Sequence, residues 1–63
     1  MTKIALDLPP DEARALAQFA KRTCHGDCER LASRHDAGEE RDAMWAALLK
    51  LQRALADAGY APR

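Results

Sequence analysis

The chain opens with Lys3-Ile4-Ala5-Leu6-Asp7-Leu8-Pro9-Pro10-Asp11-Glu12-Ala13, a stretch that predicts a short strand leading directly into a helix. Ile4, Leu6 and Leu8 alternate with smaller or charged residues, which is the period-two pattern of a strand with one buried face. Pro9 cannot donate to a sheet ladder and should end the strand. A lone strand needs a partner. We therefore expect a mostly helical protein whose N-terminal strand, covering Ile4 to Leu8, is paired in a dimer.

Two helices are predicted after this strand. Pro10 suits a first helical position, and the apolar spacing that follows predicts a helix from about Pro10 to Thr23. Gly26 is expected to adopt a left-handed conformation. Asp27 would then cap a short second helix from Cys28 to about His35.

A long final helix is the strongest expectation, and it should span Glu39 to Ala58. Asp36-Ala37-Gly38 is expected to form a turn before it, although the helix could also run through this point with a kink. An apolar seam recurs along the helix at Met44, Leu48, Leu51, Leu55 and Ala58. Gly59 suits a left-handed residue after the helix, with Tyr60 packing back on Leu55.

Size and charge limit the classes of function. With 63 residues, the chain should form one domain, 1–63, and one this small is marginal in stability by itself. Charged residues make up 32% of the chain and sum to a net charge of zero, so no general basic field favours nucleic acid or an anionic membrane. No apolar run reaches the length of a membrane span, and no signal-peptide core opens the chain. Two cysteines make no disulfide framework, and we expect a cytoplasmic location.

Metal binding and catalysis are not expected. Cys24, Cys28 and His35 are candidate zinc ligands, with His25 beside them, but their spacing matches neither a zinc knuckle nor a zinc finger. The chain contains no phosphate-binding glycine loop and no catalytic triad order. Cys28 lies near the expected helix start, but a chain this small can hardly build a catalytic pocket around its thiol. We expect no cofactor and no enzymatic activity.

An interaction surface is the favoured use of the apolar residues. Trp45 lies beside the seam of the last helix, and core and interface roles are about equally compatible with its position. The residues expected at an interface combine the strand and the seam: Ile4, Leu6, Met44, Trp45, Leu48, Leu51 and Leu55.

The segment from Lys3 to Leu31 resembles the ribbon-helix-helix family of bacterial repressors. The resemblance rests on the strand Ile4 to Leu8, the junction Pro9-Pro10-Asp11-Glu12, the helix ending Ala20-Lys21-Arg22-Thr23 and the restart at Asp27-Cys28-Glu29. It implies two chains that pair their strands into an antiparallel ribbon. The outward side chains of this ribbon would contact the bases in the DNA major groove. The outward strand positions would be Lys3, Ala5 and Asp7. Ala5 has no group to bond a base edge, and Asp7 would be repelled by phosphates.

The ending Leu51 to Arg63 makes the whole chain similar to short uncharacterised proteins of proteobacterial mobile elements, a similarity that implies no activity. We therefore expect a small protein–protein interaction module that homodimerises or docks on a larger complex, a class that includes phage- and plasmid-encoded inhibitors. The alternative is a ribbon-helix-helix-like DNA-binding autoregulator. Its cationic contacts would be Lys3, Lys21, Arg22 and Arg30.

Overall fold

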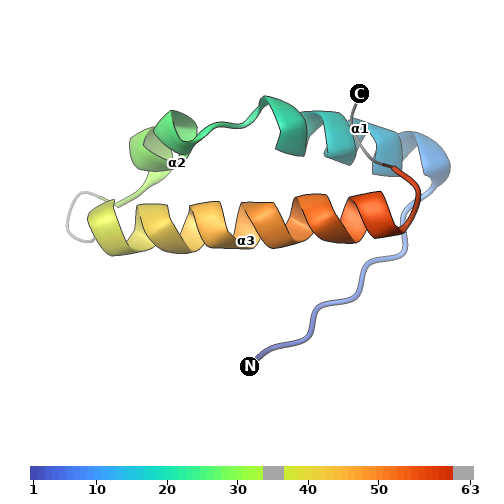
Figure 1. The fold of residues 1–63 in the computed structure, drawn as a ribbon, viewed down its shortest axis with the longest axis horizontal. Coiled ribbons are helices and arrows are strands. Elements are labelled where there is room, and N and C mark those ends of the chain that lie inside the picture. Colours follow the sequence, from blue (N-terminus) through green and yellow to red (C-terminus); the bar gives the residue numbers. More distant parts are fainter. Residues whose placement is uncertain (34–36, 61–63) are drawn as a thin grey trace.

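A computed structural model describes residues 1–33 and 37–60 of the chain. It contains helices α1 (Pro10–Arg22), α2 (His25–Leu31) and α3 (Ala37–Asp57). Figure 1 shows α1 and α2 following one another along the same side of α3, and each of them packs on α3. Residues 1–9 form an extended arm that leaves the N-terminal end of α1 and runs past the C-terminal end of α3.

The prediction of an N-terminal strand was wrong, because no residue of 1–33 or 37–60 belongs to a β-strand. No backbone hydrogen bond connects residues 1–8 to another described segment. The prediction relied on a partner strand, and the described residues supply no second strand to pair with the first. The alternation of Ile4, Leu6 and Leu8 has a different consequence, since these three side chains line one side of a groove.

Helix α1 begins where the sequence predicts and ends one residue earlier. Pro10 occupies its first turn, and Asp11 and Glu12 add negative charge at the positive end of the helix dipole. The hydroxyl of Thr23 donates to the carbonyl of Phe19 at 2.7 Å and closes the last turn. The helix buries Ala13, Ala17 and Ala20 against the rest of the molecule, whereas Phe19 is exposed.

Helix α2 begins three residues before the predicted start. Cys24 is its N-cap, and Asp27 lies inside the first turn, where its carboxylate accepts from the backbone N–H of Cys24 at 2.9 Å. Asp27 thus stabilises the helix start from the N3 position instead of the N-cap position. Gly26 lies within the helix, and Gly59 is the one described residue with a positive φ.

Helix α3 begins at Ala37, so Ala37 and Gly38 belong to the helix and not to the expected turn. Asp36 and His35 lie outside the described residues. The helix ends at Asp57, close to the predicted Ala58. Gly59 has a φ of 95°, and the N–H of Tyr60 donates to the carbonyl of Leu55 at 2.8 Å. This geometry confirms the predicted helix ending.

The core is thin because alanine supplies most of the α1 side. Ala17 and Ala20 pack with Leu48 and Leu55 of α3, and all four are buried. The Gln52 side chain donates to the carbonyl of Ala20 at 2.7 Å and ties the middle of α3 to the end of α1. Small side chains let two helices approach closely, so little volume is enclosed. Among the described residues, no helix combines the length and apolar character that crossing a membrane requires.

Candidate protein-binding groove

An apolar groove of about 610 Å³ lies between the arm, α1 and α3. Ala13 and Leu16 of α1 form part of its floor. Ala47, Leu51 and Ala54 of α3 and Ala58 just after it follow one another along the groove at spacings of four, three and four. Thr2, Ile4, Leu6 and Leu8 face these helices from the arm, and Lys50, Leu55 and Tyr60 complete the lining.

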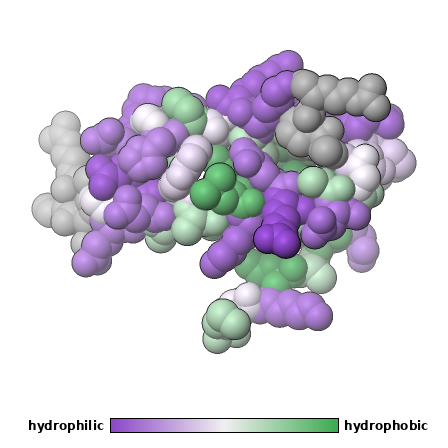
Figure 2. Space-filling view, in the orientation of Figure 1, coloured by the Kyte–Doolittle hydropathy of each residue, from purple (hydrophilic) through white to green (hydrophobic). Residues whose placement is uncertain are grey.

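The arm does not fill this groove. Ile4 remains 79% exposed and Leu6 65% exposed, although both border the same cavity. Figure 2 shows hydrophobic side chains between the body of the molecule and the arm. Exposed apolar area of this kind costs free energy in water, so the groove is a surface suited to contact with another apolar surface.

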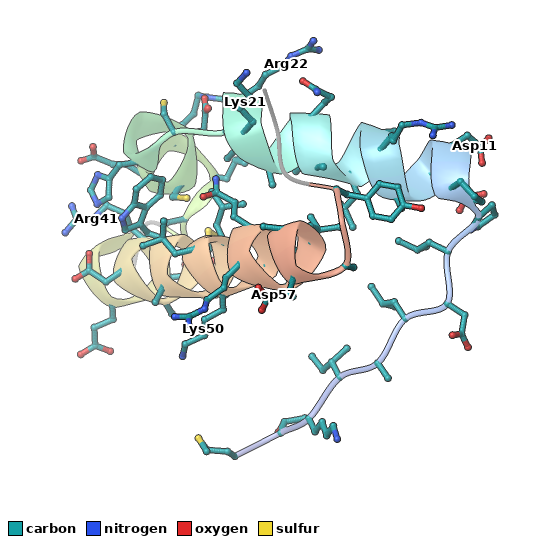
Figure 3. The ribbon with its side chains drawn as sticks, turned by 45° about the vertical axis from the view of Figure 1, so that its right-hand side comes forward. Asp11, Lys21, Arg22, Arg41, Lys50 and Asp57 are labelled. Atoms are coloured by element: carbon teal, nitrogen blue, oxygen red, sulfur yellow. The ribbon has the colours of Figure 1, made fainter. Side chains whose placement is uncertain are left out.

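Lys50 lines the groove at the edge of α3 farther from α1, and Asp57 lies one heptad beyond it on the same side of the helix. Figure 3 shows both side chains projecting from that edge of α3. The groove therefore has an apolar floor and a rim that carries one positive and one negative charge on α3.

Some of the predicted interface residues belong to the buried core, and others line the groove. Leu48 and Leu55 belong to the buried core, and Leu55 also reaches the groove lining. Ile4, Leu6 and Leu51 line the groove, where Leu51 is half-buried. Met44 is also half-buried but does not contribute to the groove lining.

Trp45 lies on the side of α3 that receives α2. Its ring is half-buried against the core, and the ring of His25 meets it edge to face, with centroids 5.6 Å apart and an interplanar angle of 82°. Cys28 is buried, and Arg41 of α3 lies 3.8 Å from the Glu29 carboxylate. Trp45 thus packs against α2 of the same chain.

Sequence reasoning missed most of the groove floor. Five residues that line the groove were not among the expected interface residues, namely Leu8, Leu16, Ala47, Ala54 and Ala58. The available signal was the heptad spacing of Ala47 and Ala54, which lie beside the predicted seam and continue its residues Leu51 and Ala58.

The four cations expected in a DNA-binding form do not share one surface. Lys21 and Arg22 end α1, and Figure 3 shows them at the end of that helix away from the arm. Lys3 lies on the arm, beyond the other end of a helix about 20 Å long. Arg30 pairs with Asp27 of its own helix at 3.3 Å. The two-stranded ribbon that the ribbon-helix-helix resemblance implied has no counterpart in the described residues.

The cysteine region has a structural role at the start of α2. Cys24 is exposed, Cys28 is buried, and His35 lies outside the described residues. Hydrogen bonds from the backbone N–H and the thiol of Cys24, and then from Arg30, lower the pKa of the Asp27 carboxyl from its ordinary 3.8. Within 1–33 and 37–60, no three metal-ligating side chains gather into a candidate site.

A second, shallower hollow of about 470 Å³ lies between α1 and α2. Phe19 and Leu31, both largely exposed, border it together with Arg22, Asp27 and Arg30. It is smaller than the groove and has more charged residues on its border.

In comparison with known proteins, the chain matches the model of DUF7706, a family of unknown function, over residues 1–63. Neither a curated protein nor a solved structure matches the chain.

Proposed function

The chain belongs to the DUF7706 family of unknown function, and from its geometry we propose that it is a non-enzymatic protein–protein interaction module whose working surface is the apolar groove. One observation carries the proposal, namely that Ile4 and Leu6 stay largely exposed beside a floor formed by Leu16 and Leu51. A partner that fills the groove would remove this apolar area from water, at about 25 cal/mol for each Å².

The proposed ligand is an apolar protein segment. The groove floor is helical and built from alanine and leucine, which suits a helix laid alongside it. A cytoplasmic place of action is part of the proposal, because both cysteines are free thiols, as expected in a reducing compartment. A small inhibitor that docks on a larger complex would use a surface of this kind.

Ala54→Glu tests the proposal with little risk to the fold. Ala54 is exposed and lies in the middle of the groove floor, so a carboxylate there would be buried only when a partner binds. Ala56→Glu is the matched control, because Ala56 is also exposed on α3 but about 200° around the helix from Ala54 and outside the groove.

Both variants should keep the helical circular dichroism of the unmodified protein. Binding is measured by sedimentation for self-association and by quantified capture of a discrete protein from host extract. We expect the unmodified protein and Ala56→Glu to bind in at least one assay, and Ala54→Glu to lose that binding. Binding that survives Ala54→Glu, or none in either assay, would contradict the proposal.

A further inference from the structure

We propose that the occupant of the groove is a second copy of this chain, which lays its α3 antiparallel on the first α3 about a two-fold axis. This inference rests on the proposed function, since it names the partner of the same groove. Each arm then covers the α3 of the other copy. Three features of the molecule support it: its surface area, the self-complementary shape of the groove and the charges on its rim.

The first feature is the accessible surface. The chain exposes 5306 Å² for a mass of 7.0 kDa. A folded monomer of this mass normally exposes about 4,000 Å². The excess, about 1,300 Å², exceeds the roughly 800 Å² that each partner buries in an interface of standard size. A dimer would bring the exposed area of each chain toward that of an ordinary compact protein.

The second feature is that one chain supplies both halves of the contact. The floor presents Ala47, Leu51, Ala54 and Ala58 in heptad register, and the arm presents Ile4 and Leu6 beside it. In an antiparallel pair, Leu51 of each copy falls opposite Ala54 of the other, so a large side chain meets a small one twice. A two-fold axis repeats this contact and closes the assembly.

The third feature is the charge on the rim. Lys50 and Asp57 occupy the same heptad position beside the floor residues Leu51 and Ala58. Antiparallel helices bring such equivalent positions together, so Lys50 of each copy would face Asp57 of the other. The pair forms twice, and the net charge of zero leaves no overall repulsion between copies.

A parallel pair fits less well. It would bring the side of one α3 that carries Lys50 toward the side of the other α3 that carries Leu48 and Leu55. The latter side is already buried against α1 in the same chain. The antiparallel arrangement keeps α1 on the outside of the dimer and leaves the intramolecular core unchanged.

Charge exchange between copies tests the arrangement by sedimentation at low salt. The unmodified protein should be dimeric at micromolar concentration. Lys50→Glu makes both rim positions acidic, and Asp57→Lys makes both basic. Each substitution turns two attractive pairs into two repulsive ones, and each should raise the dimer dissociation constant about tenfold or more. Both side chains are at exposed positions, so the helical circular dichroism should not change.

An equimolar mixture of the Lys50→Glu and Asp57→Lys chains should restore dimerisation. In the mixed dimer the introduced carboxylate of one chain faces the introduced ammonium of the other, and the remaining Lys50 and Asp57 still face each other, so both pairs are attractive again. Ala54→Glu should give a monomer, and Ala56→Glu a dimer. A mixture that stays monomeric would overturn the antiparallel register, and so would a dimer that Ala54→Glu leaves intact.

The same measurements separate this inference from the proposed function. An unmodified protein that stays monomeric at millimolar concentration overturns the second copy as occupant. If that monomer still captures a different protein, and Ala54→Glu abolishes the capture, the interaction module stands and only its partner has been misidentified. If Ala54→Glu changes neither assay, both proposals fail.

Discussion

Asp27 is the residue on which the start of α2 depends. Its carboxylate accepts from the Cys24 backbone N–H at 2.9 Å and from the Cys24 thiol at 3.4 Å, and it pairs with Arg30. All three partners favour the charged form, which is why the pKa of Asp27 is lowered. A seven-residue helix has few internal hydrogen bonds, so the charge at its first turn matters to its stability.

We predict that Asp27→Ala lowers the thermal midpoint at neutral pH and that the difference from the unmodified protein disappears in acid. A carboxyl with a lowered pKa in the folded state stabilises the fold above its unfolded pKa. This stabilisation is lost as the pH falls through the pKa that Asp27 has in the folded protein, which lies below 3.8. Thermal melts followed by circular dichroism across this range measure the effect. Asp42 is the control, because its exposed carboxylate pairs with its chain neighbour Arg41 at 3.1 Å, and Asp42→Ala should show a much smaller difference. A midpoint difference that persists in acid would argue against this role of the charge.

Leu55 contributes its side chain to the core and its carbonyl group to the C-terminal end of α3. It is buried against Ala17 and Ala20, and its carbonyl accepts the hydrogen bond that closes the C-terminus of α3. Because the core contains few large side chains, each leucine in it accounts for a large share of the buried apolar area.

Leu55→Ala is therefore expected to lower the free energy of unfolding by about 2–5 kcal/mol, enough to unfold much of a small domain. Leu49→Ala removes the same atoms from an exposed position on the same helix and should change it by about 0.5 kcal/mol or less. Urea denaturation of both variants compares them. Equal losses would mean that the core is not on the Leu55 side of α3.

At the scale of elements, α2 is a short helix held by its contacts with α3. The His25 and Trp45 rings, buried Cys28 and the Glu29–Arg41 pair provide those contacts. Since Trp45 is the only tryptophan, its fluorescence reports on the packing of α2.

We predict that His25→Ala shifts Trp45 emission to longer wavelength, because loss of the ring exposes the indole to water. The loss of unfolding free energy should be about 0.5–1.5 kcal/mol, the usual range for an aromatic pair. Arg30→Ala, which removes only a partner within α2, should leave the emission unchanged. Unchanged emission in His25→Ala would show that the ring pair does not shield Trp45 in solution.

At the level of the whole molecule, zero net charge and dispersed cations are the reason for proposing a protein partner and not a nucleic acid. Lys21 and Arg22 lie at one end of α1 and Lys3 beyond the other, so no continuous basic face forms from these residues. We expect no binding to duplex DNA with a steep salt dependence, as measured by fluorescence anisotropy at low and physiological salt. Tight, salt-sensitive binding would restore the DNA-binding alternative and remove the main reason for preferring a protein partner.

The features that depend only on neighbouring residues could be predicted from the sequence. Pro9 and Pro10 start α1 because proline fixes its own backbone, and Gly59 ends α3 because it accepts a positive φ. The start of α2 is also local, but Cys24 occupies the N-cap position that was expected for Asp27. Asp27 can stabilise a helix from either N-cap or N3, and the sequence alone did not distinguish the two.

Which surface each apolar pattern faces depends on how distant segments of the chain pack together. The alternation of Ile4, Leu6 and Leu8 is local, but a strand requires a distant hydrogen-bonding partner, and the described part of this chain provides none. The apolar stripe of α3 is wide enough to serve two surfaces. Leu48 and Leu55 pack on α1, and Leu55 also reaches the groove lining, whereas Ala54 and Leu51 lie on the open groove. Periodicity shows that a stripe exists, but the side on which α1 docks determines which part of it becomes core and which remains available for a partner.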